Sequence, residues 1–279
     1  MTRIGEGEEI DFAGAQTALA PAECRHADAT DRRQRERQGE FAFLGTTLRS
    51  MSVDEVAAWL VRRAAFRRRS PVIVTHANAH NLHVLRRAEL LDELEQSGRL
   101  FLEGIGMKLA ALSGGHGWRR DANGTDMAPL VFQGCARFGI PIYLLGGRPP
   151  VIARAVRRLR ERYPGLRIVG ARHGYVTPRT EAGVVGKIRA SGAALLVQGR
   201  GCPLQEEFSL CWASELGVNV VWNVGGLFDF LAGARPRAPR WMRRARLEWL
   251  FRLALEPRRL AVRSVVSFPA LLMAAARNR

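Results

Sequence analysis

The sequence predicts an α/β protein with a Rossmann-like parallel sheet flanked by helices and a basic helical appendage at its carboxyl end. Six short apolar runs alternate with stretches of helical spacing along most of the chain. Strands that are apolar throughout and separated by helices are typical of a parallel sheet covered on both faces. Arginine dominates the composition beyond residue 235. We therefore expect a disordered tail over 1–38, an α/β core over 39–234 and the helical appendage over 235–279.

The spacing of apolar residues places the individual elements. Ser52 is a capping residue for a helix in which Val53, Val56 and Leu60 share one face. The expected strands are Pro71–Val74, Leu100–Leu102, Ile140–Leu145, Leu166–Val169, Ala193–Val197 and Val218–Trp222. The expected helices are Ser52–Arg68, Leu82–Leu94, Pro150–Tyr163, Thr180–Ser191 and Glu206–Leu216.

Glycines and polar side chains follow each expected strand. In chain order, the segments are Thr75-His76-Ala77-Asn78, Glu103-Gly104-Ile105-Gly106, Gly146-Gly147, His173-Gly174-Tyr175, Gln198-Gly199-Arg200-Gly201 and Gly225-Gly226. Ligands bind beyond the carboxyl ends of the strands in open parallel sheets. The sequence therefore predicts a binding site at this edge.

The charge of the chain is strongly basic. It has 43 Lys and Arg residues against 26 Asp and Glu residues, a formal net charge of +17, with an ordinary hydrophobic content of 47%. Such a balance predicts an anionic partner, and charge alone leaves nucleic acid, an acidic membrane surface and phosphate-bearing substrates open.

The sequence also indicates a compartment. The four cysteines form no CxxC pair, which favours free thiols in a reducing environment. The amino-terminal residues lack a basic start followed by an apolar stretch, so we expect no signal peptide. The longest apolar stretch, Ser264–Ala276, is too short for a membrane span. We expect a cytoplasmic protein, free or bound to a membrane surface.

The last 45 residues hold 12 arginines against Glu248 and Glu256, with Trp241, Trp249 and Phe251 interleaved among them. Such a segment is typical of a basic amphipathic helix on an anionic bilayer. The alternative is a solvated helix that packs its aromatic side chains into the core. Both interpretations stay open at the level of sequence.

Several motifs occur in a specific order. They are FLGTTLRSMSVDEV, LEGIGMKLA, NGTDMAPL, IYLLGG, YPGLRIVGARHGYV, GRGCPLQEEF and VGGLFDFLAGARPRAPRWMRRARLEWLFRLALEPRRL. As a set, they resemble the WecG/TagA/CpsF glycosyltransferase family over about residues 43–265. The closing motif is long and carries most of the specificity.

The resemblance implies an inverting glycosyltransferase of surface polysaccharide or exopolysaccharide synthesis. It would move a hexose-type sugar (N-acetylmannosamine, its uronic acid or another hexose) from a UDP-sugar to a polyprenyl-diphosphate-linked acceptor. The expected location is the inner face of the cell membrane, held peripherally through the carboxyl-terminal arginines.

The resemblance also implies two catalytic residues. Glu103 occupies the position of the family's Asp in a D-G-x-G motif, where a carboxylate would take the proton of the attacking hydroxyl. Glu103 would otherwise be a carboxylate that stabilises a helix amino terminus. Gln205 matches the family's G-x-P-x-Q-E motif and would hydrogen-bond the donor or acceptor. The Pro203-to-Glu206 stretch also fits ordinary helix initiation.

The remaining candidates would bind substrate. By resemblance to the family's motifs or by position at the strand ends they are Thr75, His76, Asn78, Asp126, Gly146, Gly147, His173, Tyr175, Glu206, Gly225 and Asp229. Asp126 would otherwise cap a helix, the Gly-Gly pairs would mark turns, and His173 would be a core histidine. The sequence has no Asp-x-Asp pair, so we expect a metal-independent enzyme in which arginines hold the diphosphate. These are Arg237, Arg244, Arg252, Arg258 and Arg259.

Three other functions compete with this interpretation. A nucleic-acid-binding protein would spread its basic residues over a reading surface, whereas here they concentrate at one end. A dinucleotide oxidoreductase would carry G-x-G-x-x-G after its first strand, which is missing. A non-catalytic relative of the family is the third, because Glu103 replaces the usual Asp.

Overall fold

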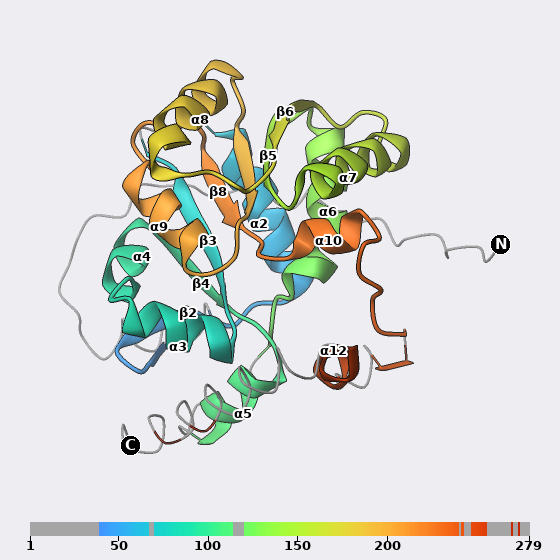
Figure 1. Ribbon diagram of the computed structural model, residues 1–279. Helices are drawn as coiled ribbons and strands as arrows, with labels where there is room; N and C mark the ends of the chain where they lie inside the picture. Colours follow the sequence, from blue (N-terminus) through green and yellow to red (C-terminus); the bar gives the residue numbers. More distant parts are fainter. Residues whose placement is uncertain are drawn as a thin grey trace, which may run out of the picture.

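The computed structural model describes residues 39–66, 70–113, 120–239, 241–242 and 247–255, together with 269 and 273. The described residues form an α/β structure in which helices cover both faces of a mostly parallel sheet (Figure 1). This architecture confirms the predicted fold class. The whole of the predicted tail, 1–38, and much of the predicted appendage lie outside the described residues, so those two boundaries stay predictions.

The described sheet has eight strands in the order β1-β2-β4-β3-β8-β7-β5-β6. They are β1 (Glu40–Phe43), β2 (Thr46–Arg49), β3 (Val72–Ala77), β4 (Gly98–Leu102), β5 (Ile142–Gly146), β6 (Ile168–Arg172), β7 (Leu195–Gly199) and β8 (Val220–Asn223). Only β1 and β2 pair antiparallel; the other described pairs are parallel. The six strands expected from apolar runs are all present.

The β1–β2 hairpin was not predicted. Its turn places Leu44 in a left-handed conformation, with φ of 54°, beside Gly45. Positive φ at both turn residues is typical of a tight hairpin turn, but the usual sequence signal is Asn-Gly or Asp-Gly. Because a leucine occupies the first turn position, the sequence does not carry the usual signal for this turn.

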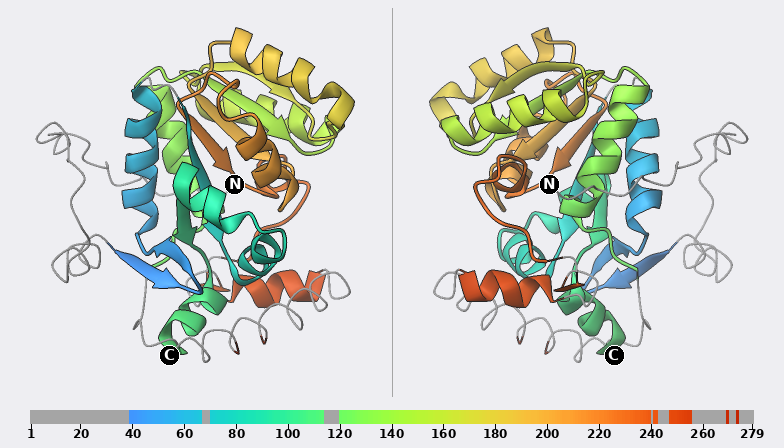
Figure 2. Two further views of the ribbon diagram at one scale, coloured as in Figure 1. Left: turned by 90° about the vertical axis from the view of Figure 1, so that its left-hand side faces the viewer. Right: turned by 90° about the vertical axis from the view of Figure 1, so that its right-hand side faces the viewer.

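Helices form a layer on each face of the sheet (Figure 2). One face is covered by α2 (Val53–Ala65), α6 (Gly124–Arg137), α7 (Pro149–Arg162) and α10 (Leu227–Leu231). The other is covered by α3 (Ala79–Arg87), α4 (Leu91–Ser97), α8 (Pro178–Ala190) and α9 (Leu204–Cys211). Two further helices, α5 (Ile105–Ser113) and α12 (Glu248–Leu255), lie together at one end of the molecule.

Two helix predictions need correction. The single helix expected over Leu82–Leu94 is two helices, because the chain turns at Glu89, whose φ is 57°. The first of them starts earlier than expected, since the Asn78 side chain accepts a hydrogen bond from the backbone of Asn81 at 2.9 Å and caps the helix. Helix α6 was expected only as a helix that follows Asp126, with no bounds, because Pro129 interrupts its helical pattern; it starts at Gly124, before Asp126.

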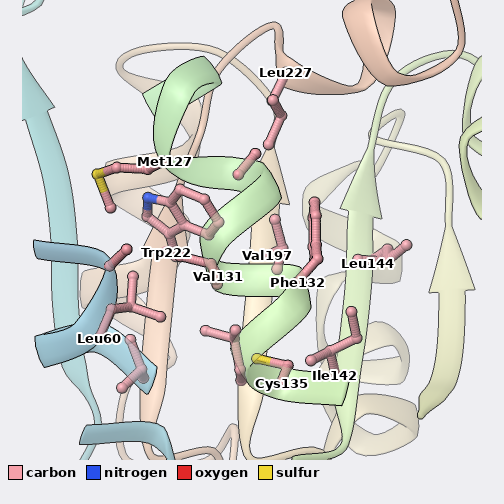
Figure 3. Packing of buried hydrophobic residues seen from close by; sticks show 14 of the residues in the cluster. Leu60, Met127, Val131, Phe132, Cys135, Ile142, Leu144, Val197, Trp222 and Leu227 are labelled. Atoms are coloured by element: carbon pink, nitrogen blue, oxygen red, sulfur yellow. The ribbon is translucent and has the colours of Figure 1, made fainter. Parts of the chain in front are cut away.

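Helix α6 nevertheless packs centrally on the sheet (Figure 3). Its Val131, Phe132 and Cys135 are buried with Trp222 of β8. The burial of this apolar face outweighs the helix-breaking residue, as tertiary packing generally outweighs propensity. The amino terminus of α6 is thereby fixed against the carboxyl ends of β3 and β4.

None of the helices in the described part of the chain is long and apolar enough to cross a membrane.

Candidate active site

The site lies where the connections of neighbouring strands diverge. After β3 the chain enters α3 on one face, whereas after β8 it enters α10 on the opposite face. The strands β3 and β8 are hydrogen-bonded neighbours. Such a divergence opens a crevice at the carboxyl ends of the strands, which is where ligands bind in sheets of this kind.

Glu103 follows β4 and is partly exposed at this edge. Its Oε2 accepts a hydrogen bond from Asn78 Nδ2 at 3.3 Å, and its Oε1 accepts one from the backbone N–H of Gly124 at 3.3 Å. A carboxylate has about four acceptor positions, so two remain for a ligand. Two different elements therefore orient the carboxylate while leaving it able to accept a proton.

Thr75 and His76, at the end of β3, are buried and engaged by the protein. The Thr75 hydroxyl accepts a hydrogen bond from Asn223 Nδ2 at 3.1 Å. His76 Nε2 accepts one from Trp222 Nε1 at 2.8 Å, so Nδ1 carries the proton and donates to the Ala122 carbonyl at 2.9 Å. The observed contacts of both side chains are with the protein and hold β3 to β8 and to Ala122. Contact of Thr75 or His76 with substrate stays a prediction.

Gln205 follows a cis Cys202–Pro203 bond at the start of α9, and its side chain is only 2% exposed. Its Oε1 accepts a hydrogen bond from the backbone N–H of Gly225 at 3.0 Å, and its Nε2 donates to Glu206 Oε1 at 2.8 Å. Both ends of the amide are thus bonded to protein. In this conformation Gln205 fixes the β8–α10 loop to α9.

A buried polar network underlies Gln205. Gln198 Nε2 donates to the Gln205 carbonyl at 2.6 Å and to Asn223 Oδ1 at 3.2 Å. Ser209 Oγ also donates to Asn223 Oδ1, at 3.0 Å. Because Asn223 bonds to Thr75 as well, the network joins β7, β8, α9 and β3. Asn223 and Ser209 were missed; a polar residue that ends an apolar strand was the available signal for Asn223.

Glu206 is fully buried beside Gln205. Burial raises the pKa of its carboxyl to about 7, and the hydrogen bond from Gln205 opposes that rise. The group is therefore substantially protonated near neutral pH. A buried carboxyl of this kind fits an internal support better than a charged ligand for a negatively charged diphosphate.

The glycines at the ends of β5, β7 and β8 allow close packing of the backbone. A Cβ on Gly146 would lie 2.5 Å from the Gly199 carbonyl oxygen, and one on Gly199 would lie 2.5 Å from that of Gly225. The Gly147 N–H donates to the Gly199 carbonyl at 3.3 Å. These contacts explain why glycine is needed here; phosphate binding by Gly146, Gly147 and Gly225 stays a prediction.

His173 and Tyr175 stand together beyond β6, with ring centroids 6.2 Å apart. Tyr175 is 64% exposed, while Nδ1 of His173 is buried and has no hydrogen-bond partner among the described residues. An exposed aromatic ring beside an imidazole is suited to stacking on a planar group. Nucleobase contact by this pair stays a prediction.

Arg237 reaches back from the start of the basic segment to α6. It pairs with Asp126 at 2.8 Å and with Glu248 of α12 at 3.1 Å. Burial lowers the pKa of Arg237, but the two carboxylates outweigh burial and raise it above the usual value. Asp126 is not the helix cap; Asn123 is, since its Oδ1 accepts hydrogen bonds from the backbone of residues 125 and 126. Arg237 therefore lies against the first turn of α6, the helix whose Gly124 N–H bonds to Glu103.

The other predicted residues are less defined. Asp229 of α10 pairs with Arg235 at 3.5 Å. Arg252 belongs to α12, but its side chain lies outside the described part, as do Arg244, Arg258 and Arg259. The described residues hold no cluster of three or more His, Cys, Asp or Glu side chains arranged to hold a metal ion. Metal independence stays a prediction.

A family model for the glycosyl transferase WecG/TagA/CpsF family matches residues 41–279. The chain belongs to this family. The match covers most of the chain, including the site edge and the basic segment, and confirms the resemblance found from the motifs. The protein is therefore a glycosyltransferase of cell-surface polysaccharide synthesis. The family match therefore supports neither a dinucleotide oxidoreductase nor a nucleic-acid-binding protein.

Proposed function

We propose that the protein transfers a hexose-type sugar from a UDP-sugar to a polyprenyl-diphosphate-linked acceptor, with Glu103 as the general base. The observation that supports this most is the Glu103 carboxylate, which is partly exposed at the strand edge and oriented by Asn78 and Gly124. A general base must be fixed within reach of the proton that it removes and must keep a free acceptor position.

In the proposed reaction the acceptor hydroxyl oxygen attacks C1 of the donor sugar while its proton passes to Glu103. The bond between C1 and the diphosphate oxygen breaks, and UDP leaves with the bonding electron pair. Attack opposite the leaving group inverts the configuration at C1. Arg237 pairs with Asp126 and Glu248, so it would have to exchange one of these partners to bind the diphosphate, whose oxygens arginine geometry suits.

The end of the protein that carries α5 and α12 would face the membrane. The exposed side chains Leu109 and Leu112 belong to α5, and Trp249, Leu250 and Leu255 belong to α12. The sequence from residue 235 onward adds 12 arginines against two glutamates. Exposed apolar and aromatic side chains among arginines are the composition of a surface that binds an anionic bilayer. This supports peripheral attachment at the inner face of the cell membrane.

The reaction is tested with purified protein, membrane extract containing lipid-linked acceptors and a panel of UDP-sugars. UDP release together with a new lipid-linked product is expected for one donor class. UDP release without a lipid product would contradict the proposed acceptor. Binding of DNA in a salt-dependent gel shift, with no response to any sugar nucleotide, would instead restore the nucleic-acid alternative.

Membrane attachment is tested by truncation before Arg235. We expect a folded core that no longer binds vesicles containing anionic lipids and that loses most transfer to lipid acceptors. The matched control is the full chain on vesicles of neutral lipid, which should bind more weakly because the arginines find no anionic headgroups. Full activity of the truncated protein on a lipid acceptor would contradict the role of the basic segment.

A further inference from the structure

The Glu103 turn is held by a neighbouring extended segment that precedes α6. The backbone N–H of Ala122 donates to the Leu102 carbonyl at 3.0 Å, and that of Gly124 donates to the Glu103 carboxylate at 3.3 Å. In addition, Asp121 Oδ2 accepts a hydrogen bond from the backbone N–H of Gly104 at 3.3 Å. Residues 121–124 thus hold the turn at three successive points.

Lys108 of α5 completes this arrangement from the other side. Its ammonium group forms an ion pair with Asp121 Oδ1, and its side chain is only 1% exposed. Its backbone N–H also donates to the Gly104 carbonyl at 3.3 Å. Gly104 is therefore fixed at its N–H by Asp121 and at its carbonyl by Lys108.

Stability alone is a weak reason for this pair. Removing a lysine and an aspartate from water costs several kcal/mol per ion, and apolar side chains of similar size often fill such a place equally well. Lys108 moreover lies on the inward face of α5, among buried Met107, Ala110 and Ala111, where an apolar residue is the default. Departures from local sequence rules concentrate at functional sites.

The position of the pair explains what it would do. Gly104 has φ of 85° and no side chain. The backbone of the turn is therefore intrinsically flexible, and by itself it does not fix the orientation of the Glu103 side chain. A glutamate also has one more rotatable bond than the aspartate of the resembled motif, and each free bond must be restricted to hold the carboxylate in place. The two ties at Gly104 restrict the backbone from which Glu103 projects.

We infer that Asp121 and Lys108 form a positioning pair that fixes the Glu103 turn for proton removal from the acceptor hydroxyl. The inference rests on the proposed role of Glu103 and adds two residues to it. Neither side chain is placed to contact the reacting atoms. The Asp121 carboxylate acts on the backbone N–H of Gly104, and the Lys108 ammonium acts through its ion pair with Asp121. The pair should therefore affect the rate of the chemical step more than the binding of either substrate.

The experiment measures kcat and the KM of donor and acceptor for full-length D121A and K108M. We expect kcat to fall by about 10- to 100-fold in each, because a small misplacement of a reacting group has an effect of that size. Both KM values should stay within about twofold of wild type. The matched control is R120A, which removes the neighbouring but exposed pair of Arg120 with Glu55 and should leave kcat unchanged.

A double variant separates positioning from general damage to the fold. If Asp121 acts through Glu103, D121A should cause no further loss of kcat in an E103Q background, whereas independent effects would multiply. Should D121A fail to fold, D121N keeps an oxygen acceptor for Gly104 and should show a smaller loss of kcat with unchanged KM. Wild-type kcat in D121A or D121N, or multiplicative losses in the double variant, would overturn the inference.

The outcomes also separate this inference from the proposed function. If E103Q transfers sugar as fast as wild type, Glu103 is not the general base, and the inference about the positioning pair is wrong as well. If E103Q is inactive while D121A, D121N and K108M keep wild-type kcat, only the positioning pair is wrong.

Discussion

The two halves of the strand edge hold their polar side chains in opposite ways. Beside β3 and β4, the Glu103 carboxylate is partly exposed and accepts hydrogen bonds from two other elements while keeping acceptor positions free. Beside β7 and β8, the Gln205 amide is buried and both of its ends are bonded to protein. The comparison teaches that equally recognisable motifs can place one side chain open to a ligand and another where the protein itself occupies both ends of it.

The comparison also separates the two carboxyl groups. Glu103 is partly exposed and accepts hydrogen bonds from the Asn78 side chain and the Gly124 backbone, whereas Glu206 is buried beside Gln205 and burial raises its pKa to about 7. A partly exposed carboxylate suits proton transfer from an incoming substrate, while a buried one with a raised pKa suits internal packing. Each half therefore makes a distinct prediction.

The largest effect is expected at Glu103. E103Q keeps the shape of the side chain but removes its ability to take a proton, so we expect kcat to fall by about 100- to 10,000-fold. The melting temperature should change little, since the carboxylate is partly exposed and makes only two long hydrogen bonds. E103D should retain more activity than E103Q; wild-type rates in both variants would rule out Glu103 as the base.

A smaller loss of activity and a larger loss of stability are expected at Gln205. Q205A removes the partner of the partly buried N–H of Gly225 and of the buried carboxyl of Glu206. Each unsatisfied buried group costs about 1 to 3 kcal/mol, so the free energy of unfolding should fall by about 2 to 4 kcal/mol. Chemical denaturation measures this loss. A wild-type unfolding curve with kcat as low as that of E103Q would show instead that the amide acts on the substrate.

A pH effect on stability is expected at Glu206. Because its pKa is about 7 in the folded protein and near 4.5 when unfolded, the folded state binds more protons between those two pH values. The contribution of Glu206 to stability is therefore fully present below pH 4.5 and is lost as the pH rises through 7.

The matched variant is E206Q, which keeps an oxygen acceptor for Gln205 and cannot ionise. Relative to wild type, it should gain roughly 3 kcal/mol of stability between pH 4.5 and pH 8, since one pKa unit corresponds to about 1.4 kcal/mol. Denaturant unfolding at both pH values measures the difference. Parallel pH dependence of the two proteins would show that Glu206 is charged in the folded state.

The smallest effect is expected from metal removal. Since the sequence has no Asp-x-Asp pair and arginines would hold the diphosphate, treatment with EDTA should leave the transfer rate within about twofold of the untreated enzyme. Restoration of a lost rate by added Mg²⁺ or Mn²⁺ would show that a metal ion shares this role.

Sequence reasoning found the sheet but not all of its surroundings. The apolar strands and the polar residues after them were readable because burial on both faces and binding at strand ends leave direct traces. The β1–β2 hairpin was missed because Leu44 occupies a turn position where Asn or Gly is usual. A helix after Asp126 was expected, but its bounds were not, because Pro129 interrupts a helix that packing stabilises.

Within the site, the motifs located Glu103, Asn78 and Gln205 but could not show their contacts. Whether an amide faces substrate or protein depends on the elements around it, and here Gly225 and Glu206 come from different parts of the chain. Asp121 and Lys108 were missed for the same reason, since a pair 13 positions apart leaves no periodic trace in sequence.

The most direct test of this account measures transfer rate and unfolding free energy side by side for E103Q and Q205A, with one UDP-sugar and one lipid-linked acceptor. The account predicts that E103Q is folded like wild type but almost inactive, and that Q205A is clearly less stable yet retains far more activity than E103Q. The reverse pattern, with an active E103Q and a stable but inactive Q205A, would contradict it.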